Sequence, residues 1–111
     1  MIDIERILDE YRNLAAEYSK ARATRTYIEE FKKSRFAILM KEAEKQGFKT
    51  AAAQEREAYA SQDYIEFLDN LRTAVESEER LRYQMKSIEM QAEVWRTSRA
   101  DERFERKQYN A

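Results

Sequence analysis

The stretch Gln46-Gly47-Phe48-Lys49-Thr50 contains the only glycine of a chain that has no proline. Glycine adopts positive φ without steric cost, so a glycine directly after a periodic segment predicts a helix end. Thr50 stands before Ala51-Ala52-Ala53, and threonine is a preferred N-cap for a following helix. Because sheets and loop-rich folds need glycine and proline at their turns, the sequence has room for about one sharp turn.

Upstream of this turn, apolar residues repeat at alternating steps of three and four from Ile4 to Ala21, which predicts one face of a helix. Asp3 is the expected N-cap, and Ile2 and Ile7 occupy the positions of a hydrophobic staple. The stripe then shifts its phase and resumes through a second set of positions. This second set is Thr24, Ile28, Phe31, Arg35 and Ile38. We therefore predict a helix over residues 3–46.

Downstream of the turn, the pattern predicts a second long helix over residues 51–108, with residues 47–50 as the turn. Its apolar seam consists of Tyr64, Leu68, Leu71, Val75, Leu81, Met85, Ile88, Ala92 and Trp95, and it changes phase between Val75 and Leu81. Because this helix is the longer one, its part from about Val94 onward is expected to extend past the start of the first helix. The alternative is a break at residues 60–63, where Asp63 and Glu66 are spaced as a capping box.

Charge supports antiparallel folding about the turn. Residues 1–19 have a net charge of −3 and residues 20–46 of +4, whereas residues 54–79 have −6 and residues 80–111 have +3. Folding the chain at Gly47 places negative beside positive in both halves, and complementary flanking charge sets orientation in coiled coils. The expected fold is all-α: one domain over residues 1–111, with two long helices in an antiparallel, coiled-coil-like hairpin that dimerises into a four-helix bundle.

Composition limits the chemistry. The chain contains no histidine and no cysteine, so it has no imidazole or thiolate metal ligands and no histidine-assisted nucleophile. We expect no enzyme activity, no metal and no cofactor. The alternative is a magnesium-dependent hydrolase that binds its metal with helical carboxylates, for which Glu76 and Glu79 are one suitably spaced pair. The longest apolar run, residues 36–40, is far shorter than the roughly 20 residues that span a bilayer, so we expect a cytoplasmic protein without a membrane segment.

Two sets of residues are candidates for contacts with partners. The first set lies off the predicted hairpin seam, mostly towards the turn, and is expected to mediate self-association because contiguous exposed apolar patches mark interfaces. This set is Tyr27, Phe36, Leu39, Met40, Ile65 and Phe67. The second set follows steps of three and four on the C-terminal overhang, beside the only tryptophan. It is Arg96, Arg99, Arg103 and Arg106, together with Trp95.

The arginine set allows three interpretations: a solvated helix face, a contact with a protein partner, or a grip on the phosphates of a nucleic acid. Acidic residues at 101, 102 and 105 reduce the local charge, and the chain as a whole has a net charge of −1. That balance differs from the basic one of dedicated nucleic-acid binders. We therefore expect a binding or assembly module that contacts itself and another protein, with a nucleic-acid-binding accessory as the alternative.

One segment carries a resemblance. The stretch from Leu81-Arg82-Tyr83 to Glu93-Val94-Trp95-Arg96-Thr97 resembles short helical proteins of bacteriophage early or recombination gene clusters. It covers about a sixth of the chain. The resemblance implies a phage or prophage origin and a small accessory role.

Overall fold

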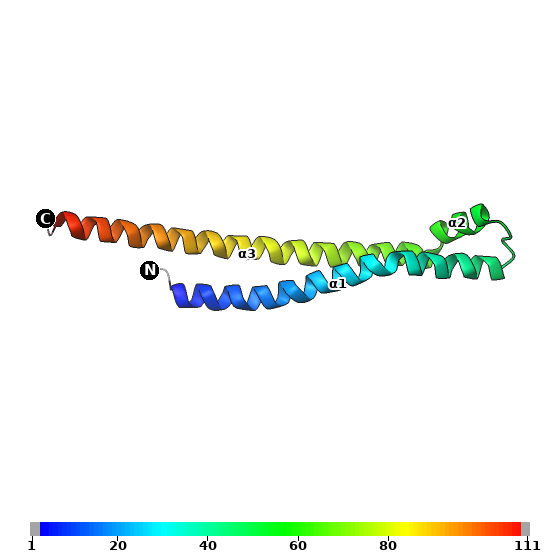
Figure 1. The fold of residues 1–111 in the computed structure, drawn as a ribbon, viewed down its shortest axis with the longest axis horizontal. Helices are drawn as coiled ribbons and strands as arrows, with labels where there is room; N and C mark the ends of the chain where they lie inside the picture. Colours follow the sequence, from blue (N-terminus) through cyan, green and yellow to red (C-terminus); the bar gives the residue numbers. More distant parts are fainter. Residues whose placement is uncertain (1–2, 110–111) are drawn as a thin grey trace. The chain divides into compact units, whose positions relative to one another are not determined.

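A computed structural model describes residues 3–109, and this part of the chain forms three α helices and no strand. They are α1 (Ile4–Lys45), α2 (Ala51–Ala60) and α3 (Gln62–Tyr109) (Figure 1). The all-α class is confirmed, and α1 begins and ends within one residue of the expected 3–46. Within residues 3–109, no helix combines the length and the apolar character that crossing a membrane requires.

Both ends of α1 have the expected caps. The Asp3 carboxylate accepts a hydrogen bond from the backbone N–H of Arg6 at 3.2 Å, whereas the staple partner Ile2 lies outside the described residues. At the other end, Gly47 has φ +108°. The N–H of Phe48 donates to the carbonyl of Ala43 at 3.2 Å, and the N–H of Gly47 donates to the carbonyl of residue 44 at 3.1 Å. This is the Schellman pair of bonds, which satisfies carbonyls that the helix itself leaves unpaired.

Replacing Gly47 with valine is expected to lower the free energy of unfolding by about 1–2 kcal/mol, because a β-branched residue is strained at positive φ. A Cβ at this position would meet no atom within 4 Å, so the loss comes from the backbone conformation and not from a clash. Urea titrations followed by far-UV circular dichroism measure it. Gly47→Asn should lose less, since asparagine tolerates such φ values better. Equal stability of the valine variant and the wild type would contradict the prediction.

The expectation of one continuous helix over residues 51–108 is wrong. α2 ends at Ala60 and α3 begins at Gln62, with Ser61 between them in an extended conformation (φ −68°, ψ 145°). The Ser61 hydroxyl donates to the carbonyl of Ala58 at 2.7 Å and accepts from the N–H of Tyr64 at 3.2 Å. One serine side chain therefore bonds the end of α2 and caps the start of α3. The alternative of a break at residues 60–63 is confirmed, but its cap is Ser61 and not Asp63.

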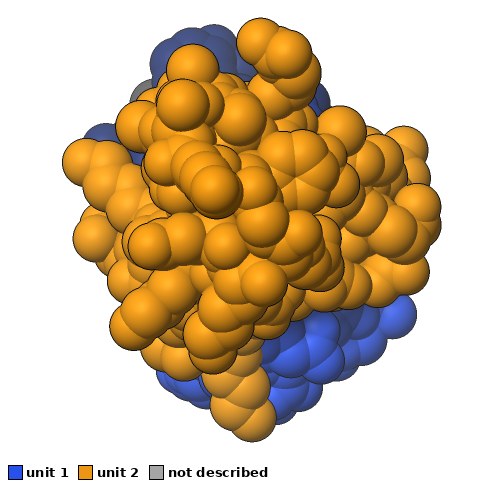
Figure 2. Space-filling view, turned by 90° about the vertical axis from the view of Figure 1, so that its right-hand side faces the viewer, with its two compact units in different colours: residues 1–19, 79–111 blue, residues 20–78 orange. Residues whose placement is uncertain are grey.

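The chain divides into two compact units, each of which is described by itself (Figure 2). Unit 2 consists of residues 20–78, in which α2 and the first part of α3 run antiparallel to the second half of α1 (Figure 1). Its core consists of Leu39, Ala58 and Tyr64, with Phe36 and Met40 packed against them. The rings of Phe36, Tyr59 and Tyr64 lie with centroids 4.5–5.7 Å apart, in tilted and edge-on arrangements that aromatic pairs favour.

Ion pairs in unit 2 follow the predicted charge pattern. Arg35 of α1 lies 3.6 Å from Asp63 of α3, and Arg25 pairs with Glu78 further along the same two helices. The predicted phase shift of the α1 stripe to Thr24 is wrong, since Thr24 is exposed while Arg25 and Ile28 are half-buried. The contact face of α1 thus continues from Ala21 through Arg25, a charged residue that an apolar pattern passes over.

Unit 1 consists of residues 1–19 and 79–111, so that the first part of α1 lies beside the second part of α3. Its most buried apolar side chains are Ile7, 1% exposed, and Leu81 and Ile88, each 8% exposed. The hydroxyl of Tyr11 in α1 donates to the Glu89 carboxylate of α3 at 2.9 Å. Every described residue from position 96 onward is exposed, as expected where the longer helix extends past its partner.

The hydrogen bond to Glu89, and after it the negative charge of that carboxylate, raise the pKa of Tyr11 above its ordinary value of 10.0. Because the folded-state pKa is the higher one, the stability from this bond is complete below pH 10.0 and is lost as the pH rises through the folded-state pKa. The stability difference between wild type and Tyr11→Phe should therefore shrink above that pH. Urea titrations of both proteins at about pH 8 and about pH 11 test this, and a difference that is constant or grows would contradict it.

Candidate interaction surfaces

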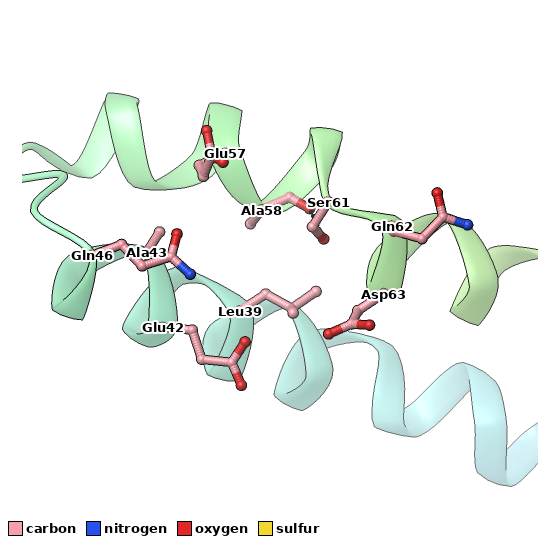
Figure 3. A pocket seen from close by; sticks show the side chains of 9 residues that line it. All are labelled: Leu39, Glu42, Ala43, Gln46, Glu57, Ala58, Ser61, Gln62 and Asp63. Carbon is pink, nitrogen blue, oxygen red and sulfur yellow. Dashed lines mark hydrogen bonds between the residues drawn. The ribbon is translucent and has the colours of Figure 1, made fainter.

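A recess of about 210 Å³ lies over the break between α2 and α3 (Figure 3). Its floor is apolar, since Leu39, Ala43 and Ala58 are each at most 4% exposed. Its rim is polar and includes Glu42 and Asp63, the latter held by Arg35. The buried floor belongs to the core of unit 2, and Ser61 lines the recess where α2 ends and α3 begins.

Of the six residues predicted for self-association, the structure places three in the core of unit 2 or against it. Leu39 is 4% exposed and is part of the core cluster, and Phe36 and Met40 pack on that cluster. Their assignment to a free surface is therefore corrected. The reason is the break at Ser61, because α2 covers this face of α1 as a separate short helix. The other three residues are Tyr27, 69% exposed, Ile65, 51% exposed, and the half-buried Phe67.

Two of these three belong to a continuous line of rings that we call the aromatic ladder: Tyr27, Phe31 and Phe67. Tyr27 and Phe31 are four residues apart on α1, and their rings stack with centroids 6.1 Å apart and planes within 6°. The ring of Phe31 also lies 6.4 Å from that of Phe67 on α3. Phe31, which the stripe pattern assigns to the helix seam, is 36% exposed. The ladder is therefore an aromatic surface of unit 2 that is open to solvent.

The arginine face of α3, Arg96, Arg99, Arg103 and Arg106, lies on one side of the helix, within an arc of roughly 80° at about 3.6 residues per turn. Arg96 pairs with Glu93 and Arg99 with Glu102, each at 3.3 Å and each between exposed side chains. Exposed pairs of this kind contribute little to stability, about 0–1 kcal/mol each. Trp95 is half-buried, as its place in the apolar seam requires, while Phe104 is 63% exposed. The face is thus partly neutralised by its own helix.

The two carboxylates that suggested a magnesium-dependent hydrolase, Glu76 and Glu79, have different surroundings in the structure. Glu79 accepts hydrogen bonds from the guanidinium of Arg82, the shorter of them 2.6 Å long, whereas Glu76 is exposed on the same helix and does not join that contact. Over residues 3–109, no three acidic side chains gather in the manner of a metal site.

The most buried charged group lies outside both predicted sets. Glu78 is 7% exposed, and both its carboxylate oxygens accept hydrogen bonds from Arg25, which also pairs with Glu29 at 2.6 Å. The hydrogen bond to Glu78 is the main cause that raises the pKa of Arg25, so the guanidinium is charged at every accessible pH. The signal in the sequence is a pair of opposite charges at positions that continue both seams, Arg25 after Ala21 and Glu78 after Val75.

The chain matches no protein-family model, no curated protein and no solved structure.

Proposed function

We propose that the chain is a non-catalytic helical assembly module, which binds another copy of itself and one further protein. The observation that carries this proposal is the aromatic ladder, since three rings from two helices join into one solvent-open apolar surface. Single exposed apolar residues are common, but contiguous patches are found mainly at interaction sites. Aromatic side chains are also enriched among the residues that dominate binding energy at interfaces.

The experiment is an affinity purification from the native host with matched variants. Tyr27→Asp changes the most exposed member of the ladder, and Tyr109→Asp makes the same change at an aromatic residue in unit 1 that is 91% exposed. A protein recovered in stoichiometric amount by the wild type and by Tyr109→Asp, but lost with Tyr27→Asp, would support the proposal. Equal recovery with all three would show that the ladder is not the contact, and circular dichroism checks that each variant stays helical.

A second candidate function is nucleic-acid binding through the arginine face. The observation in its favour is that Arg103 and Arg106 are exposed and form no ion pair within residues 3–109, and that Phe104, which is 63% exposed, lies close to them in the sequence. Phosphate contacts weaken steeply with salt, so binding should fall sharply between about 50 and about 200 mM salt. The absence of a gel shift at the lower concentration, or a shift that survives Arg103→Gln with Arg106→Gln, would count against this function.

We further propose a cytoplasmic location and a small accessory role in a phage or prophage. The lack of cysteine supports the location, because structural disulfides are typical of oxidising compartments. The resemblance of residues 81–97 supports the role.

A further inference from the structure

A second, largely apolar stripe runs along α3 on the side opposite its buried seam. Its members, Tyr83, Ser87, Met90 and Val94, follow steps of four, three and four, which is the spacing of one helix face. Tyr83 is 61% exposed, Met90 68% and Val94 56%. We call these four residues the α3 stripe. Because the seam residues Leu81 and Ile88 are each only 8% exposed, this part of α3 has two apolar faces, of which α1 covers one.

One flank of the α3 stripe carries a base and an acid. Lys86 and Glu93 lie seven residues apart on this flank, and both line the open apolar groove around Met90 and Val94. The Lys86 ammonium lies 5.4 Å from the centre of the Tyr83 ring. A helix with opposite charges at this spacing presents complementary charge to a reversed copy of itself.

We propose that the α3 stripe pairs with the α3 stripe of a second copy of this chain, in antiparallel orientation, about a two-fold axis level with the peptide between Ile88 and Glu89. This inference rests on the proposed assembly function and names the partner for this one face. In that register Tyr83 packs against the partner's Val94 and Ser87 against the partner's Met90, so a large side chain meets a smaller one in each layer. Lys86 faces the partner's Glu93, and the symmetry forms this pair twice.

Charge separates this arrangement from a parallel one. In a parallel coiled coil, a residue at this flanking position faces the residue of the partner that comes about five positions later in the sequence. A parallel pair would therefore place Lys86 beside the partner's Gln91 and Glu93 beside the partner's Ser98. Neither combination is a charge pair, whereas the antiparallel register gives two. The two α3 helices would then lie side by side in the centre, with the α1 segment of each unit 1 on the outside.

The contact is small. Four side chains from each copy fall below the roughly 1,200 Å² at which specific, stable interfaces begin, so we expect association in the micromolar range or weaker. Sedimentation of the full chain over a range of concentrations measures it. The apparent mass should rise from near 13.4 kDa towards twice that value as the concentration increases. A mass that stays at the monomer value up to about 200 μM, well above the micromolar range expected for such small contacts, would overturn the inference.

The charge pair gives the sharpest test. Lys86→Glu and Glu93→Lys should each weaken association by about tenfold, because each replaces two attractions with two repulsions. The double variant should restore the wild-type affinity, since it exchanges the two charges without changing the pairing. A double variant as weak as the single ones would overturn the register.

Two apolar substitutions on the same helix provide a matched comparison. Met90→Glu should abolish association, whereas Phe104→Glu should leave it unchanged, because Phe104 lies beyond the paired stretch although it is similarly exposed, 63% against 68%. The reverse outcome would overturn the inference. Failure of these tests leaves the purification with Tyr27→Asp unaffected, so a failure at the α3 stripe can be told apart from a failure at the aromatic ladder, which carries the proposed function.

Orientation is tested directly with one spin label. The chain has no cysteine, so Phe104→Cys creates a single attachment site outside the paired stretch. At about 1.5 Å per residue, the antiparallel register separates the two labels by about 45 Å along the helices. A parallel pair would hold them within about 20 Å, since helix axes pack roughly 8–10 Å apart and the labels add their own length. A short distance would overturn the antiparallel pairing.

Discussion

Leu39→Ala is expected to lower the free energy of unfolding by about 2–5 kcal/mol, the range measured when buried leucines are truncated. Leu39 is 4% exposed and joins Ala58 of α2 to Tyr64 of α3, while Phe36 and Met40 pack against this cluster. Its removal would leave a void among helices that meet at the Ser61 break, where Figure 3 shows Leu39 and Ala58 between α1 and α2. Because small domains are marginally stable, a loss of this size is a large fraction of the total stability.

The neighbouring residue offers a matched control. Ile38 is adjacent in α1 and is 42% exposed, so Ile38→Ala removes a side chain of the same size from a position that is far less buried. We expect it to lower the free energy of unfolding by less than about 1 kcal/mol. Urea titrations of the two variants, followed by far-UV circular dichroism, measure both losses. Equal losses would mean that the core of unit 2 is not centred on Leu39.

Much of the fold is predictable because it depends on local signals. The aspartate cap, the stripe of α1 and the single glycine define the bounds of the first helix, and the structure agrees to within one residue. Thr50 is the expected cap of the next helix, and its hydroxyl accepts from the N–H of Ala53 at 3.2 Å. Each of these features follows from the sequence within a few residues, without knowledge of what packs on them.

The break at Ser61 is harder to predict, because its cause is tertiary. Serine is tolerated inside helices, and neither glycine nor proline marks the position. What favours the break is the packing on either side, where Tyr59 of α2 and Tyr64 of α3 both meet Phe36 of α1. A straight helix through Ser61 would change the positions of the Tyr59 and Tyr64 rings relative to Phe36. The break also affects the predicted self-association surface, because α2 covers Leu39, a residue that the apolar pattern places on that surface.

The contact between Arg25 and Glu78 escapes sequence analysis for a different reason. A search for apolar periodicity treats a charged residue as a gap, so it reports a change of phase in both stripes at the places where the ion pair lies. In the structure the contact faces of unit 2 continue through these residues, with Ile28 half-buried next to Arg25 on α1. Opposite charges at facing gaps in two seams are therefore a usable sign of a buried pair.

Glu78→Gln is expected to lower the melting temperature clearly more than Glu93→Gln, which removes an exposed partner of Arg96 by the same chemical change. The glutamine introduced at this position carries no charge, so Arg25 would lose one of its two acidic partners and retain only Glu29. The side chain of Arg25 is only 23% exposed, so water replaces the lost partner poorly. Removing one partner from a buried pair is harmful mainly because the other charge is left without compensation. The guanidinium of Arg25 cannot lose its charge instead, since the pKa of an arginine is already high.

Glu93 provides the comparison because it lies in solvent, and the Arg96 side chain that it pairs with is 72% exposed. Thermal unfolding followed by circular dichroism compares the two variants at one protein concentration. Equal falls in melting temperature would show that the pair at Glu78 behaves as a surface pair.

A double variant separates the pair from the packing around it. Arg25→Met with Glu78→Leu replaces both charged side chains with apolar ones, and such exchanges of buried ion pairs are often neutral or stabilising. We therefore expect the double variant to be more stable than Glu78→Gln, and close to the wild type. That result would mean that the ion pair contributes little net stability and instead fixes which residues of α1 and α3 face each other. A double variant less stable than Glu78→Gln would show that the charges themselves hold this end of unit 2 together.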